Sequence, residues 1–235
     1  MTDRRPVARP GGSAVDAFLD QAKQVAPAAG GIPKARLVFA LDATMSRQPT
    51  WDLACRLQGE MFATASSVGG LGVQLVYFRG FDECKASRWV NEPKALTGLM
   101  SGIDCRGGHT QMVRVLRHVA NEAGRSPVRA LVFVGDAMEE PIDTVCAAAG
   151  ELALRGIKAF MFHEGHDPEA ARAFQEVARL TSGAYARFDA AAPGQLAGLL
   201  RAAAAYASGG VDALKRLASG DADARRLLTA LGGRS

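Results

Sequence analysis

The stretch RLVFALDATMS, residues 36–46, is the strongest indication of the fold in this sequence. Residues 36–42 are almost all apolar and too few for a stable isolated helix, which is typical of a strand covered on both faces. Asp42 stands where that strand should end, and Thr44 and Ser46 follow at alternate positions. We therefore expect a central strand that delivers three oxygen-bearing side chains to the carboxyl edge of a sheet.

Outward from this stretch, short apolar runs alternate with segments of helical periodicity. Further strands are expected at residues 72–78, 84–90, 128–136, 157–163 and 184–188, and helices at 50–67, 93–103, 111–123, 141–155, 168–181 and 193–207. The mixed polarity of residues 84–90 suits an edge strand that pairs antiparallel with its predecessor. The pattern predicts an α/β fold: a doubly wound, mostly parallel, Rossmann-like sheet of order 3-2-1-4-5-6 with helices on both faces.

The composition supports one substantial domain. With 235 residues, 48% of them hydrophobic, the chain can bury a single α/β core more comfortably than two. We expect a disordered N-terminus at 1–12, a helix and linker at 13–33, the α/β domain at 34–208 and a helical appendage at 209–235, whose two short helical patterns are divided by Gly220 and Asp221.

The charge distribution and the lack of targeting signals limit the partners and locations that we expect for this protein. The net charge of +4 is modest and its basic residues are interspersed, so the sequence does not indicate a nucleic-acid partner. The N-terminal basic residues lack the apolar segment of a secretory signal, and no apolar run of about 18 residues predicts a membrane span. The four dispersed cysteines form no C-x-x-C pair and are expected to be reduced core residues. A cytoplasmic location is expected.

Two more oxygen-bearing residues belong with Asp42. Thr110 follows the glycine-rich loop DCRGGH, and Asp136 ends the expected strand 128–136. In the order 3-2-1-4-5-6 the first and fourth strands are neighbours, which places Asp42 beside Asp136. Mg²⁺ prefers oxygen ligands and retains several waters, and Mn²⁺ accepts the same donors. Any one of these residues could simply cap a turn or helix, but the five together favour a metal site.

These residues resemble the metal-ion-dependent adhesion site of von Willebrand factor type A (vWA) domains. The family pattern, Asp-x-Ser/Thr-x-Ser followed by a later Thr and a later Asp, is matched by all five positions: Asp42, Thr44, Ser46, Thr110 and Asp136. The resemblance spans roughly residues 34–208 and includes two glycines, 107 and 108, ahead of the threonine. It implies that the hydroxyls contact the metal directly and that the aspartates hold it directly or through water.

Three features near the motif keep alternative interpretations open. Ala137 stands where many relatives have glycine, and Glu139 and Glu140 follow it. This acidic pair can add charge to the rim of the site, but we favour the positive start of the next helix as its place. His109, next to Thr110, can tune the site or be an ordinary exposed loop residue.

The resemblance implies a protein-interaction module rather than an enzyme. A bound Mg²⁺ or Mn²⁺ with an incomplete shell can accept an Asp or Glu of a partner protein. Intracellular relatives often act as adaptors beside an ATPase or in a multiprotein complex, so such partners are implied by the resemblance alone.

Two other functions stay open. A Mg²⁺-dependent phosphoryl-transfer hydrolase also places an aspartate at a strand end, but the haloacid-dehalogenase pattern needs a second aspartate where Thr44 stands. Other catalytic motifs are missing, and His163 and His166 lack the spacing of a helical zinc motif. The second alternative is a scaffold in which the metal site is idle and residues 209–235 mediate assembly.

Overall fold

A computed structural model describes residues 35–66, 70–189 and 191–232, apart from the side chains of Ser46 and Ser66. The segments expected at 1–12 and 13–33 lie outside the described residues. Within the described part, six strands form one sheet of order β3-β2-β1-β4-β5-β6. The strands are β1 (Arg36–Asp42), β2 (Gly72–Arg79), β3 (Glu83–Val90), β4 (Ala130–Gly135), β5 (Lys158–Glu164) and β6 (Ala184–Phe188).

The fold class and the strand order predicted from the sequence are confirmed. The strand pairs are parallel except for β2 and β3, which form the expected antiparallel edge. β1 is central, with β2 on one side and β4 on the other. The register pairs Asp42 with Phe78 of β2 and Leu41 with Val134 of β4, so the three strands end at one edge of the sheet.

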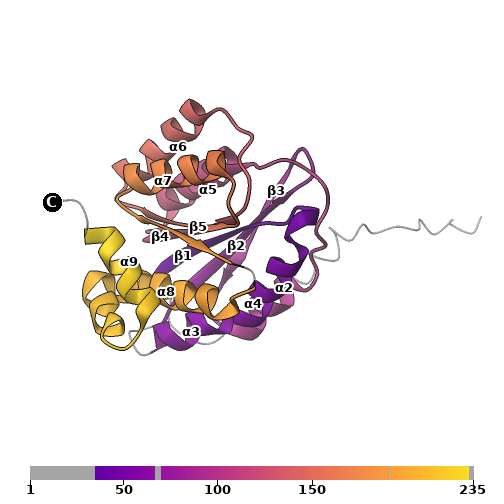
Figure 1. Cartoon of the computed structure of the whole chain (residues 1–235). Helices are drawn as coiled ribbons and strands as arrows, with labels where there is room; N and C mark the ends of the chain where they lie inside the picture. The colour runs from indigo at the N-terminus through magenta and orange to yellow at the C-terminus, as the bar shows by residue number, and fades with distance from the viewer. Residues whose placement is uncertain (1–34, 67–69, 190, 233–235) are drawn as a thin grey trace, which may run out of the picture.

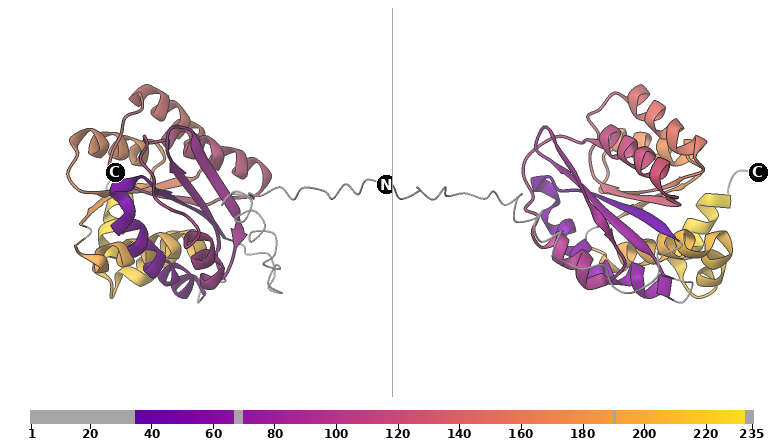
Figure 2. Two further views of the ribbon diagram at one scale, coloured as in Figure 1. Left: turned by 90° about the vertical axis from the view of Figure 1, so that its right-hand side faces the viewer. Right: turned by 180° about the vertical axis from the view of Figure 1, so that it is seen from behind.

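Helices cover both faces of the sheet (Figures 1 and 2). One face carries α5 (Met112–Arg125), α6 (Ile142–Leu154) and α7 (Pro168–Leu180). The other carries α2 (Gln48–Leu57), α3 (Gly59–Ser66), α4 (Pro93–Met100), α8 (Pro193–Ala218) and α9 (Ala222–Gly232), and a short 3-10 helix, η1 (Met45–Arg47), precedes α2. This layering is the one expected for a doubly wound sheet.

Alternate residues of β1 belong to two separate hydrophobic cores. Leu37, Phe39 and Leu41 pack with the face of α2, α3, α4 and α8, whereas Val38 and Ala40 pack with α5, α6 and α7. Because successive side chains of a strand point to opposite faces, a strand buried on both sides must be apolar at nearly every position. The unbroken apolar run of residues 37–41 is therefore what makes β1 central.

The helix expected at 50–67 is two helices. α2 ends at Leu57 and α3 begins at Gly59, with the buried side chain of Gln58 donating a hydrogen bond to the hydroxyl of Thr97. Glycine is a poor helix former, and the tertiary bond of Gln58 fixes the break at this position. The apolar periodicity alone could not show it, because it continues across the break.

The C-terminal segment packs on the main domain. α8 continues past residue 207 to Ala218, with non-helical backbone at Gly209 and Gly210, and Gly210 adopts a positive φ of 67°. Asp221 then accepts the backbone N–H of Ala224 at 3.0 Å and begins α9. Ala224 and Leu227 of α9 are fully buried in the same core as β1.

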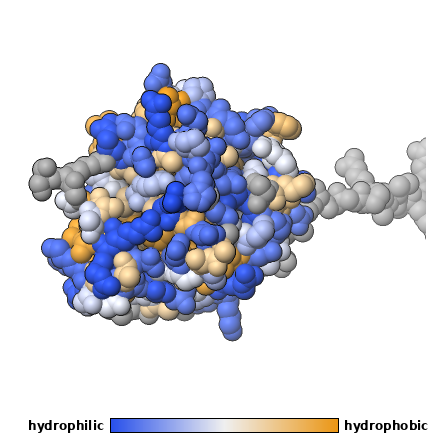
Figure 3. Space-filling view, viewed as in Figure 1, coloured by the Kyte–Doolittle hydropathy of each residue, from blue (hydrophilic) through white to orange (hydrophobic). Residues whose placement is uncertain are grey.

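The surface and the cysteines complete the description. The face seen in Figure 3 is mainly hydrophilic, with apolar residues in small groups. Among the described residues, no helix is both long enough and apolar enough to cross a bilayer. Cys55, Cys84, Cys105 and Cys146 are all free thiols.

Candidate metal centre

Asp42 ends the central strand and organises the turn that follows it. Its residue is only 4% exposed, and its Oδ1 accepts the backbone N–H of Thr44 at 2.7 Å. Thr44 is also buried, at 9% exposure, and its extended backbone leads into η1. The carboxylate of Asp42 therefore holds the backbone at the start of the connection from β1 to η1. Ser46 lies in η1, but its side chain is outside the described part of the structure.

Thr110 is buried beside the segment that follows β4. Its backbone N–H donates to Oε2 of Glu139 at 2.9 Å, and its hydroxyl donates to the carbonyl oxygen of Ala137 at 3.2 Å. The residue is 5% exposed. Both contacts lie within three residues of Asp136, so the loop that carries Thr110 reaches the carboxyl end of β4.

The loop before Thr110 can approach the β2–β3 turn only through glycine. A Cβ atom on Gly108 would lie 2.1 Å from the carbonyl oxygen of Gly80, far inside any normal contact. The next residue, His109, donates its backbone N–H to that same oxygen at 3.1 Å. Farther back, the N–H of Arg106 bonds the carbonyl oxygen of Ala43 at 2.9 Å, which ties the loop to the end of β1.

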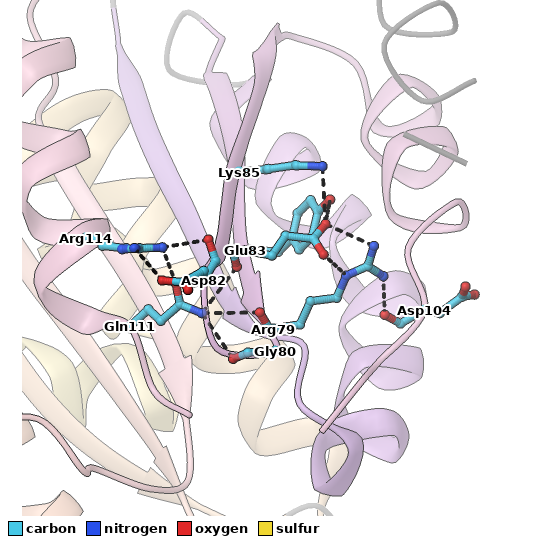
Figure 4. A network of polar contacts seen from close by, with 9 residues as sticks. Arg79, Gly80, Asp82, Glu83, Lys85, Asp104, Gln111 and Arg114 are labelled. Carbon is cyan, nitrogen blue, oxygen red and sulfur yellow. Dashed lines mark hydrogen bonds and ion pairs between the residues drawn. The ribbon is translucent and has the colours of Figure 1, made fainter. Parts of the chain in front are cut away.

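A polar network fixes the other side of this loop, as Figure 4 shows. The side-chain amide of Gln111 donates to the carbonyl oxygens of Arg79, Gly80 and Glu83 at 3.2 to 3.4 Å. Arg114 adds a hydrogen bond to the side-chain oxygen of Gln111 at 3.0 Å. The β2–β3 turn is thus attached to the start of α5, and Thr110, one residue earlier, is held in place.

Asp136 follows β4 directly and lies at the same sheet edge as Asp42. Its side chain is 28% exposed. The two aspartates are close enough for the charge of Asp136 to raise the pKa of Asp42. Their juxtaposition follows from the pairing of β1 with β4, in which Leu41 is opposite Val134.

The environment of Asp42 disfavours its negative charge. Burial is the largest cause and raises the pKa of Asp42 to about 6, while hydrogen bonds from Thr44 and the positive charge of Arg47 lower it. A carboxylate removed from water in this way needs positive charge nearby to remain ionised.

Two charged residues of this region were not predicted from the sequence. Arg47 in η1 is 2% exposed, and its guanidinium forms an ion pair with the carboxylate of Glu164 at the end of β5. Its Nη1 also lies 3.9 Å from Oδ2 of Asp136. Thr50 donates its hydroxyl to the same oxygen of Glu164. The available signal was that Glu164 ends a strand next to β4, at the edge where Asp42 and Asp136 were expected.

The acidic pair after Ala137 serves a different helix from the one expected. Glu139 accepts the N–H of Thr110, and Glu140 accepts the N–H groups of Met112 and Val113 at the first turn of α5. The prediction that the pair stabilises the start of the following helix, α6, is therefore wrong. Only the tertiary structure brings the β4–α6 loop to the beginning of α5.

The histidines have separate surroundings. The ring of His109 is exposed and packs against the exposed Phe81, with ring centroids 5.1 Å apart. His163 is fully buried and its Nδ1 lies 3.0 Å from the hydroxyl of Tyr185, while burial lowers its pKa. His166 is exposed.

The donor chemistry of this edge fits a hard cation with few protein ligands. Among the described residues, no three His, Cys, Asp or Glu side chains are grouped so as to hold a metal ion. A cation here would have to be held by Asp42 and Asp136 with the hydroxyls of Thr44 and Thr110, and with water. That set matches Mg²⁺ or Mn²⁺, which accept hydroxyl and water oxygens, better than Zn²⁺.

Comparison with solved structures identifies the fold as that of vWA domains. A vWA protein from Catenulispora acidiphila aligns with a TM-score of 0.62 and 16% identity over 74% of this chain and 43% of that one. The pilus adhesin SpaC from Lactobacillus rhamnosus GG aligns at 0.55 and 10% over 74% and 30%. The VWA domain of SpRpn10 aligns at 0.55 and 9% over 69% and 94%.

These likenesses concern the fold alone. The chain spans less than half the length of the first two structures, with 43% and 30% of them covered. No family model matches the sequence, and no curated protein does. The resemblance inferred from the motif is thus confirmed for the fold, while metal binding stays a prediction.

Proposed function

We propose that this protein is a metal-dependent interaction module and not an enzyme. Asp42, Thr44, Ser46, Thr110 and Asp136 would hold Mg²⁺ or Mn²⁺ at the carboxyl edge of the sheet, and an Asp or Glu of a partner protein would complete the coordination shell. The observation that carries the proposal is the buried carboxylate of Asp42, which lies close enough to Asp136 for the charge of Asp136 to raise its pKa, while the hydroxyl of Thr110 bonds the carbonyl oxygen of Ala137, the residue after Asp136.

The charge of the site supports an acidic ligand. A divalent ion held by two protein carboxylates keeps positions for water or for a further anionic oxygen. The neutral hydroxyls of Thr44 and Thr110 add oxygen donors without adding negative charge. A partner carboxylate would therefore meet a local positive centre once the metal is bound.

The rim of the site offers apolar contacts. Met45 and Phe81 are 68% and 73% exposed, and they lie at the start of η1 and in the β2–β3 turn, which flank the site. Large exposed apolar side chains are common at the centre of interfaces because their burial contributes much of the binding free energy. By the vWA resemblance, the partner could belong to a multiprotein complex or be an ATPase for which this chain acts as adaptor.

The decisive experiment is affinity capture with and without metal. The tagged full-length protein, Asp42→Ala and the control Glu151→Ala would be compared in Mg²⁺ and after chelation. Glu151 is a suitable control because it is exposed on α6 and lies outside the segments that carry the site residues. We expect partners captured by the wild type and the control in Mg²⁺ to be lost with Asp42→Ala or chelator.

Equal capture under all conditions would refute metal-dependent adhesion. A circular dichroism melt of Asp42→Ala in the absence of metal would establish that the variant is folded. Partners that are retained by Asp42→Ala would instead point to a surface away from the site, such as α8 and α9.

A further inference from the structure

Arg47 is an unusual residue for the rim of a cation site. It immediately follows the Asp-x-Thr-x-Ser motif, and at 2% exposure it is among the largest fully buried side chains of the described structure. Arginine is almost never fully buried without a specific partner, because the loss of hydration is costly. Its position therefore needs an explanation beyond surface charge.

The guanidinium of Arg47 faces the acids of the candidate metal centre. Its Nη1 pairs with Glu164 of β5 and lies 3.9 Å from Oδ2 of Asp136, which is one of the proposed ligands. Its charge also acts on Asp42, whose pKa it lowers. The positive charge of Arg47 thus occupies the same acidic surroundings that a divalent ion would need.

The arrangement satisfies Arg47 only in part. Its Nε is buried and has no hydrogen-bond partner among the described residues. An arginine kept solely for stability would normally use more of its five N–H donors. In contrast, Glu164 would keep a partner if Arg47 moved, because the hydroxyl of Thr50 donates to the same carboxylate oxygen. Movement of the guanidinium would therefore leave Glu164 in place.

We propose that Arg47 is the resident cation of this site and competes with the divalent ion for the negative charge of Asp42 and Asp136. Metal binding then requires the guanidinium to withdraw from Asp136, and Arg47 sets the metal affinity of the site. The inference rests on the proposed function, since it presumes that the motif residues can hold a metal. It adds Glu164, which lies outside the motif, as the residue that keeps Arg47 in the site.

Electrostatic repulsion is the physical reason for the proposed competition between Arg47 and the metal. Two positive centres within a few ångströms repel one another, and in a partly buried site this repulsion is screened less than in water. Removing the charge of Arg47 should therefore strengthen metal binding. Keeping a charge of the same sign at the same position should leave the affinity close to that of the wild type.

The test is a calorimetric titration of the full-length protein with Mn²⁺ and, separately, with Mg²⁺. The variants are Arg47→Met, which removes the charge and keeps an unbranched apolar chain, and Arg47→Lys, which keeps the charge. Arg201→Met is the matched control for net charge, because Arg201 pairs with Asp221 on α8 and α9. Free Mn²⁺ measured by electron paramagnetic resonance gives an independent reading of the bound fraction.

We expect Arg47→Met to bind Mn²⁺ at least about tenfold more tightly than the wild type, with Arg47→Lys and Arg201→Met within about threefold. Arg47→Gln is a second variant that removes the charge but keeps a polar side chain, so it too should bind Mn²⁺ more tightly than the wild type. This variant still decides the matter if Arg47→Met does not fold.

The outcomes separate the two proposals. If the wild type and Arg47→Met bind Mn²⁺ equally, or Arg47→Met binds more weakly, competition by Arg47 is overturned and the metal-dependent module survives. If Arg47→Gln binds no more tightly than the wild type, competition is likewise overturned. If neither the wild type nor any variant takes up metal at millimolar concentrations, metal binding itself is refuted, and competition with it.

Discussion

Two buried arginines, Arg47 and Arg79, are paired very differently. Arg79, at 5% exposure, donates from Nε and Nη2 to both oxygens of Glu83 at 2.9 and 3.0 Å, and from Nη1 to the carbonyl oxygen of Asp104 (Figure 4). Arg47 pairs through Nη1, and its Nε has no partner among the described residues.

We interpret the Arg79 pair as a structural contact and the Arg47 pair as a functional one. A bidentate arginine–carboxylate pair fixes geometry strongly, and Arg79 uses it to hold the β2–β3 turn against the loop that leads to Thr110. Arg47 keeps a buried Nε that has no hydrogen-bond partner among the described residues. Natural proteins tend to tolerate such an unsatisfied group at sites that bind a ligand or change conformation. Four measurements test this difference between the two arginines.

The largest effect is expected for Arg79→Met. It leaves Glu83 without its bidentate partner and frees the β2–β3 turn, and breaking a buried pair in this way typically costs about 3 to 5 kcal/mol of folding free energy. Urea unfolding followed by circular dichroism measures the loss. A loss below about 1 kcal/mol would show that the Arg79 pair is not the structural anchor described above.

The pH dependence of stability should reveal the same pair. Hydrogen bonding from Arg79 is the largest cause that lowers the pKa of Glu83, from 4.5 to about 2. A lowered pKa in the folded state stabilises the protein above pH 4.5, and this contribution disappears as the pH falls toward 2. After allowance for solvent screening it is about 1 to 2 kcal/mol.

The measurement is the difference in unfolding free energy between the wild type and Glu83→Gln at several pH values. The difference should be present at neutral pH and shrink between about pH 4.5 and 2. A difference that does not change across that range would contradict the assignment, because a neutral glutamine has no charge to lose.

A smaller effect is expected for Arg47→Met in metal-free buffer, about 1 kcal/mol. The substitution removes one ion pair, but it also removes a buried Nε that has no partner among the described residues. Water can hydrate the two acids that are left, because the side chains of Asp136 and Glu164 are 28% and 19% exposed. Thermal unfolding in chelator checks this. A cost equal to that of Arg79→Met would mean that Arg47 is a structural anchor too.

The smallest effect is expected for Arg114→Met, within about 0.5 kcal/mol of the wild type. Its pair with Asp82 is solvent-exposed, with side chains 49% and 86% accessible, and such pairs contribute little. Arg114→Met is therefore the matched control for Arg79→Met in the urea experiment. A large loss here would show that the network around Gln111 depends on this outer contact.

Much of the architecture could be predicted because it is encoded locally. The apolar run of residues 37–41 required a doubly covered strand, and the alternation of strands and helices led to the observed order β3-β2-β1-β4-β5-β6. The break at Gln58 could not be predicted in the same way. It depends on a contact with Thr97, a residue distant in the chain, which periodicity does not report.

The candidate site likewise has features that the sequence predicts and features that depend on tertiary packing. The positions of Asp42 and Asp136 at one sheet edge follow from the strand order, whereas the partners of Glu139 and Glu140 depend on how a loop crosses to α5. Sequence spacing placed this acidic pair beside the nearer helix, α6. The fold brings the pair to α5 instead, because the β4–α6 loop and the Thr110 loop meet at the carboxyl edge of the sheet.

From the sequence alone, the vWA-type fold could be predicted, with two aspartates and two threonines at the ends of strands and loops that meet at one edge of the sheet. The charge that these residues face depends on tertiary packing: Arg47, one residue past the motif, pairs with Glu164, which lies 117 residues away. Periodicity and motif spacing indicate which faces of the helices and strands are buried. The partner of a buried charge is chosen by folding, because it depends on which distant side chain can reach into the space where water is excluded.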